Sequence, residues 1–394
     1  DNAVLSARTA DTFTENALGA VTATPESVGY LYDASTYAGN DVDMVRLGSG
    51  TVSTAAAWPG IDVVYRPTGT IWVSTALTLD PGVWLEFDSG VRMDVGTAGS
   101  LSAVGTEDDP IVLTGREAIH GYWGGVRFNQ SNAPANRLEH VFIEYGGGYW
   151  QANLELRGTS TVNTQVAIVN CVFQESNNFG LYCDEYSVMI AFSDNVLTGN
   201  KDATAYVAPQ AVGYLEDTGA YVGNDYDVVE VRYGAVSSDA VWPAIDAAYL
   251  VTGTLTISAA LAIDPGAYLM FASGQRMDVG TNGIISAVGT AANPVVFTGE
   301  EAVPGYWGGI RLNQTNNPDN RFEYCVIEYG GGYWDANLYL AGTSANPTQV
   351  VVTNCHISDS SKCGVKYTNY VSTNADIGTA NTFANNATGN VCSP

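Results

Sequence analysis

The chain has 394 residues, with 41 Asp and Glu against 15 Lys and Arg and a formal net charge of −26. Only 14% of the residues are charged while 43 are Gly, which favours an all-β fold over a helical bundle or a disordered chain. The charge argues against nucleic-acid and anionic-membrane partners, because phosphate binding needs clustered Lys and Arg. No apolar run reaches the roughly 18–20 residues of a membrane-spanning helix, so we expect no membrane insertion.

An internal duplication organises the chain. The stretch VLSARTADTFTEN (4–16) matches VMIAFSDNVLTGN (188–200), and GYWGGVRFNQSNAPANRLEHVFIEYGGGYWQANL from Gly121 returns from Gly305, both 184 positions later. A register held over this length indicates two copies of one structural unit. The predicted parts are 1–27, a terminal coil of a preceding unit or an N-terminal cap; 28–211, the first repeat unit; and 212–394, the second repeat unit with a C-terminal cap.

Each unit consists of short apolar runs separated by turn residues. In chain order the first unit contains IWVSTALTLDPGVWLEF, VRMDVGTAGSLSAVGT, DDPIVLTG, YWGGVRFNQ and RLEHVFIEYGGG. The apolar residues in these runs fall at every second position, which predicts β-strands. No stretch of ten residues has the spacing of apolar residues that a helix would need. The strands at 141–144 and 171–174 share one in/out pattern 30 residues apart, as do those at 325–328 and 355–358. We therefore predict a right-handed parallel β-helix, a solenoid built from two tandem copies of the 184-residue unit.

The series LTLDPGVWLEF, GSLSAVGTEDDPIVLTG, GYWGGVRFNQ and LEHVFIEYGGG resembles the bacterial right-handed parallel β-helix surface proteins of the pectin-lyase-like superfamily. The resemblance covers nearly the whole chain. It implies the same fold and a secreted or cell-surface location. It implies no particular reaction, since a fold alone does not decide function.

Duplicated charged residues are the candidates for catalysis. Glu144 and Glu328, in the repeated IEYGGG, are weak candidates for the catalytic residues of a glycosidase, which needs two carboxylates on either side of the glycosidic bond. The preferred interpretation is that both side chains point outward from a strand, in a ladder of polar residues on neighbouring strands. Lyases on this scaffold usually use Lys or Arg, but a net charge of −26 repels an anionic polymer. Outward arginines paired with local Asp or Glu are preferred for the three duplicated pairs, Arg92/Arg276, Arg127/Arg311 and Arg137/Arg321. No His recurs at this offset, which excludes a duplicated His-dependent or zinc site.

Two short acidic loops, GNDVD and GNDYD, recur in the chain. Oxygen ligands at alternate positions after a Gly suit Ca²⁺, although the distal bidentate Glu of an EF-hand is missing. A plain turn is the preferred interpretation and a calcium site is the alternative, so no cofactor is required. The candidate ligands are Asn40, Asp41, Asp43, Asn224, Asp225 and Asp227.

Duplicated Tyr-Trp pairs are the candidates for ligand binding. Those in GGGYW follow a Gly triplet, so we expect their rings to project from a corner of the coil, where flat aromatic faces suit sugar rings or protein contacts. The preferred interpretation is that the rings cover the gap between a loop and the coil; sugar binding and protein contact are the alternatives. The candidates are Tyr122, Trp123, Tyr149, Trp150, Tyr306, Trp307, Tyr333 and Trp334.

Six cysteines, none in a CxxC pair, favour disulfides in an exported chain. Proximity predicts Cys171–Cys183 in the first copy. In the second copy two arrangements are open, of which the first is preferred: Cys325–Cys355 on adjacent coils with Cys363–Cys392, or a local Cys355–Cys363 bond.

These patterns together predict a non-catalytic extracellular β-helix protein with a structural, adhesive or filament-forming role. End-to-end self-association is one expected interaction, because open ends of β-coils promote pairing. A polysaccharide or cell-surface glycan bound by the Tyr-Trp pairs is the other. The alternative function is a carbohydrate-active enzyme, a polysaccharide lyase or a glycosidase, on the same scaffold.

Overall fold

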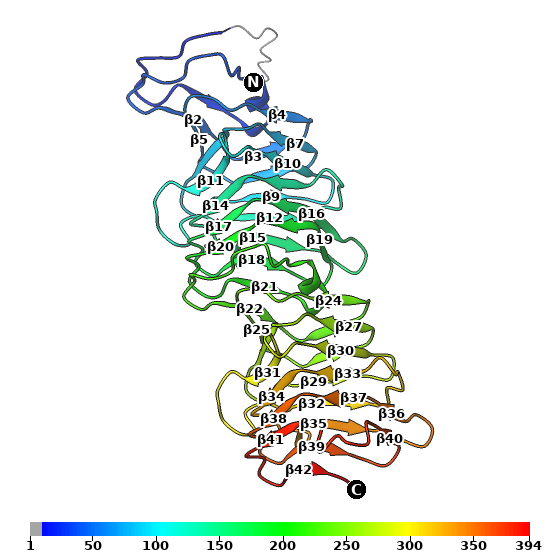
Figure 1. Ribbon diagram of the computed structural model, residues 1–394. Helices are drawn as coiled ribbons and strands as arrows, with labels where there is room; N and C mark the ends of the chain where they lie inside the picture. The colour runs from blue at the N-terminus through cyan, green and yellow to red at the C-terminus, as the bar shows by residue number, and fades with distance from the viewer. Residues whose placement is uncertain (1–9) are drawn as a thin grey trace. The chain divides into compact units, whose positions relative to one another are not determined.

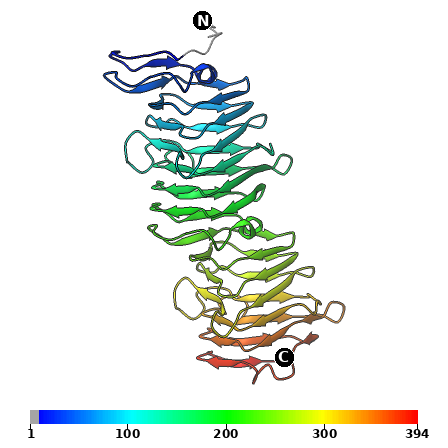
Figure 2. The same cartoon turned by 45° about the horizontal axis from the view of Figure 1, so that its top comes forward.

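The computed structural model describes residues 10–394, so the first nine residues of the predicted terminal segment 1–27 lie outside the described part. The right-handed parallel β-helix predicted from the sequence is confirmed, because short strands pair in parallel in stacked sheets (Figures 1 and 2). The described chain divides into two compact units. The first contains residues 10–205 and 218–227, and the second contains 206–217 and 228–394.

The first unit has three sheets, numbered in the order in which the chain enters them, and a 3₁₀ helix, η1 (Pro25–Tyr30). The first sheet contains β1 (Val21–Ala23), β2 (Met44–Leu47), β5 (Val64–Pro67), β8 (Trp84–Phe87), β11 (Ile111–Gly115), β14 (Val141–Glu144), β17 (Val172–Gln174) and β20 (Val196–Thr198). The second contains β3 (Gly50–Val52), β6 (Ile71–Val73), β9 (Met93–Val95), β12 (Val126–Asn129), β15 (Ala152–Arg157) and β18 (Phe179–Cys183). The third contains β4 (Ala56–Trp58), β7 (Ala76–Leu79), β10 (Ser100–Val104), β13 (Arg137–Glu139), β16 (Thr164–Val169) and β19 (Ser187–Ser193).

The second unit repeats this arrangement after β21 (Ala205–Val207) and the 3₁₀ helix η2 (Pro209–Tyr214). Its first sheet contains β22 (Val228–Val231), β25 (Ala248–Val251), β28 (Tyr268–Phe271), β31 (Val295–Gly299), β34 (Cys325–Glu328), β38 (His356–Ser358) and β41 (Thr382–Ala384). The second contains β23 (Gly234–Val236), β26 (Leu255–Ile257), β29 (Met277–Val279), β32 (Ile310–Asn313), β35 (Ala336–Ala341), β39 (Cys363–Tyr367) and β42 (Gly389–Cys392). The third contains β24 (Ala240–Trp242), β27 (Ala260–Ile263), β30 (Ile284–Val288), β33 (Arg321–Glu323) and β37 (Val351–Thr353), and a small pair is formed by β36 (Thr348–Gln349) and β40 (Val371–Ser372).

The strand register follows the 30-residue spacing seen in the sequence. Phe142 of β14 lies opposite Val172 of β17, and Val326 of β34 lies opposite His356 of β38. Because side chains alternate between the two faces of a strand, this register places like residues on top of one another. Each coil therefore continues the inner and outer columns of the coil before it.

The core of each unit is a set of apolar columns inside the coil. One column of the first unit runs along the first sheet, and every side chain in it is fully buried. Large aliphatic and aromatic side chains in these columns remove apolar surface from water at about 25 cal/mol per Å², the main driving force for folding. The members of this column are Leu85, Leu113, Ile143, Phe173 and Leu197.

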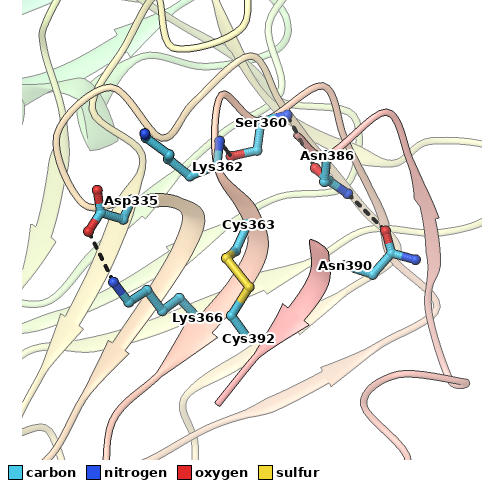
Figure 3. Close-up of a disulfide and its surroundings, with 8 residues drawn as sticks. All are labelled: Asp335, Ser360, Lys362, Cys363, Lys366, Asn386, Asn390 and Cys392. Atoms are coloured by element: carbon cyan, nitrogen blue, oxygen red, sulfur yellow. Dashed lines mark hydrogen bonds and ion pairs between the residues drawn. A yellow bond between two sulfur atoms is a disulfide. The ribbon is translucent and has the colours of Figure 1, made fainter. Parts of the chain in front are cut away.

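One disulfide joins β39 to β42 in the second unit. Cys363 and Cys392 lie with their Cα atoms 6.2 Å apart and are separated by 29 positions in the sequence (Figure 3). Nearby, Lys366 Nζ lies 3.0 Å from Asp335 Oδ2. The disulfide prediction is confirmed at this pair, and the alternative Cys355–Cys363 bond is wrong.

The other predicted disulfides are not formed. Cys171 and Cys183 are buried free thiols, because the chain turns a corner between them and places one beside β17 of the first sheet and the other in β18 of the second sheet. Burial raises the pKa of Cys171 to about 12. Cys325 and Cys355 lie on adjacent coils as predicted, with their thiols in contact, but remain free thiols.

Removing the Cys363–Cys392 bond should destabilise the end of the second unit. In the chain-entropy account, opening a loop of this length costs about 3.5 kcal/mol, because the unfolded chain gains conformational freedom. We expect Cys363→Ser/Cys392→Ser to lower the midpoint of chemical unfolding. The matched control is Cys171→Ser/Cys183→Ser, measured with and without reductant. A reductant effect that persists in Cys363→Ser/Cys392→Ser would contradict the assignment.

Candidate functional site

Two arginines and two aromatic side chains meet on the outer face of the second sheet in the first unit. Arg92 precedes β9, Arg127 lies in β12, and Tyr149 and Trp150 lie in the loop before β15. The Cζ atom of Arg92 is 3.9 Å from the ring centroid of Tyr149, and that of Arg127 is 3.8 Å from the ring centroid of Trp150. Both distances are those of cation–π contacts. With Asp94 of β9, these four side chains form what we call the first arginine–aromatic cluster.

The second unit contains the same cluster at the equivalent positions, which are Arg276, Asp278, Arg311, Tyr333 and Trp334. The Cζ atom of Arg276 is 4.2 Å from the ring centroid of Tyr333, and that of Arg311 is 3.9 Å from the ring centroid of Trp334. The two distances agree with those of the first cluster to within 0.3 Å. The duplicated sequence therefore produces a duplicated surface feature.

An aspartate pairs with one of the two arginines in each cluster, Arg127 in the first and Arg311 in the second. Arg127 donates from Nε to Asp94 Oδ1 at 3.1 Å and from Nη2 to Asp94 Oδ2 at 2.5 Å, and Arg311 makes the same two-point contact with Asp278. A two-point Arg–carboxylate pair fixes the orientation of the guanidinium plane. The paired guanidinium can then support the face of the Trp ring.

A glycine in the repeated YWGG motif makes the contact between Arg92 and Tyr149 geometrically feasible. Arg92, Gly124 and Tyr149 lie on three successive coils, and a Cβ atom at Gly124 would lie 2.7 Å from Arg92 Cβ and 3.0 Å from Tyr149 Cβ. Gly308 has the same relation to Arg276 and Tyr333. The middle coil has no side chain there, so the side chains of the two flanking coils can touch.

The two aromatic rings of each cluster differ in accessibility. Tyr149 is 58% exposed and Tyr333 is 57% exposed, as expected for rings that project from a corner of the coil. Trp150 and Trp334 are half-buried, and the ring of each meets the neighbouring Tyr edge to face. Each cluster thus presents one tyrosine to solvent, with one half-buried tryptophan beside it.

The other predicted aromatic pair is not a binding surface. Trp123 and Trp307 are fully buried and stack on Phe87 and Phe271 at centroid distances of 4.1 and 4.2 Å. Their indole Nε1 atoms donate to backbone carbonyls at 2.7 and 2.8 Å. The expectation that these two rings offer a face to a ligand is corrected, because they fill the interior of the coil.

Tyr122 and Tyr306, the neighbours of these buried tryptophans, lie half-buried at the surface. The hydroxyl oxygen of Tyr122 is 3.4 Å from Glu117 Oε1, and that of Tyr306 is 3.4 Å from Glu300 Oε2. Neither joins the arginine–aromatic clusters. The structure therefore brings together two of the four predicted Tyr-Trp pairs, each with its own set of arginines.

The candidate carboxylates Glu144 and Glu328 belong to outward polar ladders on the first sheet. Glu144 accepts from Thr114 Oγ1 at 2.9 Å and from Gln174 Nε2 at 2.6 Å, across the two neighbouring strands. Glu328 accepts from Thr298 Oγ1 at 3.1 Å. These contacts satisfy the carboxylates within the sheet, in keeping with the preferred ladder interpretation.

The acidic loops make contacts typical of turns. The side chain of Asn40 bridges two coils: its Nδ2 donates to Phe13 O at 2.9 Å and its Oδ1 accepts from Asn16 N at 3.0 Å. Asp43 Oδ1 accepts from the backbone N–H of Asn40 at 2.8 Å. The exposed Asp41 makes no side-chain contact that would assign it a ligand role.

The second acidic loop repeats these contacts. Asn224 Oδ1 accepts from Asn200 N at 3.0 Å, Asp227 Oδ1 accepts from Asn224 N at 2.7 Å, and Asp225 Oδ2 lies 3.4 Å from Lys201 Nζ. Among residues 10–394 no three His, Cys, Asp or Glu side chains are grouped to hold a metal ion. Calcium binding in these loops stays a prediction.

The expectation that the duplicated arginines pair with local carboxylates holds for three of the six; it is wrong for Arg92, Arg276 and Arg321, of which Arg321 is exposed and lies outside the clusters. Arg127, Arg311 and Arg137 pair with Asp94, Asp278 and Glu139. In the described part of the chain, Arg92 and Arg276 form no ion pair. Both were recognisable as repeated residues, but their lack of a partner depends on which coils lie beside them, which a single sequence does not show.

No protein-family model matches the chain, and no curated protein and no solved structure was found to be similar to it. Within residues 10–394, no helix has the length and apolar character needed to cross a bilayer. The class of protein defined by the structure is a parallel β-helix with one arginine–aromatic cluster in each of two repeated units.

Proposed function

We propose that this protein is a non-catalytic extracellular β-helix protein with an adhesive role, which binds glycans through its two arginine–aromatic clusters. The observation that carries this proposal is the repetition of one surface cluster, with matching geometry, in both units. A chain that displays the same site twice gains avidity for a ligand that itself repeats, such as a polysaccharide.

The chemistry of the clusters supports a sugar ligand. Each tyrosine residue is more than half exposed, and a free side of its ring can stack on the apolar face of a pyranose ring. The ring is held in place from below by a guanidinium and at its edge by a tryptophan, so little freedom remains to be lost on binding. A preorganised aromatic face on a rigid sheet is a suitable platform for a sugar.

The surroundings of the carboxylates support a non-catalytic role. Glu144 is hydrogen-bonded within its ladder on both sides, and among residues 10–394 no second carboxylate accepts from the same two donors. A glycosidase needs two carboxylates poised across one bond. The disulfide between Cys363 and Cys392 supports an extracellular location, because such bonds persist in oxidising compartments.

The proposal predicts that glycan binding depends on both exposed tyrosines. Tyr149→Ala and Tyr333→Ala should each leave one site, so binding to an immobilised polysaccharide should weaken through loss of avidity, by about tenfold or more. The double variant should lose binding almost completely. The measurement is a pull-down and surface-binding series over neutral and acidic polysaccharides. Tyr233→Ala, which removes a tyrosine that is 79% exposed outside the clusters, is the matched control.

Two outcomes would contradict the proposal. Undiminished binding in the double variant would show that the clusters are not the glycan sites. Release of new reducing ends or unsaturated products, abolished by Glu144→Gln/Glu328→Gln, would establish the alternative, a carbohydrate-active enzyme.

A further inference from the structure

We propose that the two clusters are specific for acidic glycans: Arg92 and Arg276 bind a carboxylate or sulfate group of the sugar, while Tyr149 and Tyr333 stack on its ring. This inference rests on the proposed glycan-binding function and names the class of glycan that the sites select.

Each cluster has one arginine more than it has carboxylates to pair with. In the first unit, Arg127 is paired with Asp94 and the neighbouring Arg157 with Glu155. Arg92 then remains as a positive charge with no carboxylate partner in the described part of the chain. It is half-buried, so it is partly removed from water that would otherwise solvate its charge.

The second unit reaches the same balance with different residues. Arg311 is paired with Asp278, and Lys366 with Asp335, which leaves Arg276 without an ion pair among residues 10–394. In the first unit Arg157 also lies over the ring of Tyr182, 4.0 Å from its centroid. The equivalent positions in the second unit are Ala341 and Lys366, so the surrounding pairs have changed. The uncompensated arginine beneath an exposed tyrosine is what both units retain.

The scarcity of basic residues strengthens this argument. The chain has a net charge of −26 and only 15 Lys and Arg residues. Six of these basic residues lie in or beside the two clusters. A general affinity for anions is therefore excluded by repulsion from the rest of the surface. An anion can bind only where the local charge and the contact geometry favour it. The six residues are Arg92, Arg127, Arg157, Arg276, Arg311 and Lys366.

The geometry of the unpaired guanidinium suits a planar or tetrahedral oxyanion. The Cζ atom of Arg92 lies over the Tyr149 ring, 3.9 Å from its centroid, so the ring covers one side of the guanidinium. In the second unit the Nε–H of Arg276 is buried and has no acceptor among the described residues, so hydrogen bonds to a ligand would come from its two Nη groups. A guanidinium held in this way is ready to donate two parallel hydrogen bonds to a carboxylate or sulfate.

The adjoining tyrosine identifies the rest of the ligand as a ring. Tyr149 and Tyr333 lie directly over the unpaired arginines and are more than half exposed. A free inorganic anion has no apolar surface that could stack on this aromatic face. A sugar that carries its own carboxylate or sulfate fills both contacts at once, so the clusters fit a uronic-acid or sulfated polysaccharide better than a neutral one.

The test compares hexasaccharides of three kinds by isothermal titration calorimetry: a neutral β-1,4-glucan, a polymannuronate and a sulfated galactan. The variant is Arg92→Gln/Arg276→Gln. The control is Arg46→Gln/Arg321→Gln, which removes two exposed arginines outside the clusters and changes the net charge equally. Arg92→Lys/Arg276→Lys retains the charge without the planar fork. Thermal unfolding of every variant reports whether the fold is intact.

We expect at least one acidic hexasaccharide to bind about tenfold or more tightly than the neutral one, as a charge-assisted hydrogen-bond pair provides. This preference should weaken with salt. It should disappear in Arg92→Gln/Arg276→Gln, fall partly in the Lys variant, and persist in the control. Whether the polymannuronate or the sulfated galactan binds identifies which anionic group is selected.

Equal affinity for neutral and acidic ligands, or an equal loss of preference in the control, would overturn the inference. Binding of the neutral hexasaccharide that is lost in Tyr149→Ala/Tyr333→Ala but unaffected by Arg92→Gln/Arg276→Gln would leave the proposed glycan-binding function intact. Binding of none of the three sugars by the folded protein would contradict both. If the Gln variant unfolds, the Lys variant decides the question by the same comparison.

Discussion

Replacing Trp123 or Trp307 with Ala should lower the free energy of unfolding by about 4 kcal/mol, within the usual range for loss of a large aromatic side chain from a packed core. Each tryptophan is fully buried, stacks on a phenylalanine of the first sheet and donates a hydrogen bond to a backbone carbonyl. Truncation removes the stacking partner, opens a cavity and leaves that carbonyl without its donor. Urea denaturation followed by tryptophan fluorescence and circular dichroism measures the change.

The matched control for this experiment is Trp84→Ala. Trp84 is 47% exposed on the outer face of β8, so its loss should cost about 1 kcal/mol or less. A similar effect from both substitutions would show that the buried position of Trp123 is not what stabilises the unit. Glycan binding should survive in any Trp123→Ala protein that remains folded, since this ring is not part of the clusters.

Replacing Asn153 or Asn337 with Ala should cost a similar amount, about 4 kcal/mol, because each change leaves several buried backbone groups without partners. Asn153 is fully buried; its Oδ1 accepts from Gly146 N at 2.8 Å and its Nδ2 donates to Gln174 O at 2.7 Å. Asn337 makes the equivalent contact to Gly330 N and donates to the carbonyl of Ser358. These side chains join neighbouring coils at the turn that leads from the first sheet to the second.

The control for the asparagines is Asn132→Ala, a substitution in an exposed loop, which should change stability by no more than about 0.5 kcal/mol. Hydrogen exchange of the Gly146 amide provides a local reading, since this N–H should lose protection in Asn153→Ala. An unchanged exchange rate would contradict the assigned hydrogen bond. Asn153→Asp retains the acceptor but loses the donor and buries a charge, so it should be at least as destabilising as Asn153→Ala.

Much of the fold could be predicted from the sequence because its signals are local and repeated. The period of 2 in LTLDPGVWLEF identifies strands on either side of a turn, and the 30-residue spacing of the strands around Phe142 and Val172 gives the register between neighbouring coils. The 184-residue offset then transfers every assignment to the second unit. These inferences require only that equal sequences fold alike and that side chains alternate along a strand.

Residues in the turns were harder to assign, because no periodicity governs them. Tyr149-Trp150 and Tyr122-Trp123 look equivalent as dipeptides beside glycines, yet Tyr149 projects into solvent and Trp123 fills the core. The direction of each side chain depends on how the turn enters the next strand. The same limit applies to Cys171 and Cys183, which are near in sequence and face different sheets.

The solenoid, its two copies and the residues that recur in both follow from local patterns in the chain. The folded chain was needed to show that Arg92 meets Tyr149 across Gly124, that Arg127 is neutralised by Asp94, and that Arg92 has no ion-pair partner among residues 10–394. The physical reason is that these contacts join successive coils. Whether side chains on different coils touch depends on the lengths of all the turns between them, which only the folded chain brings into register.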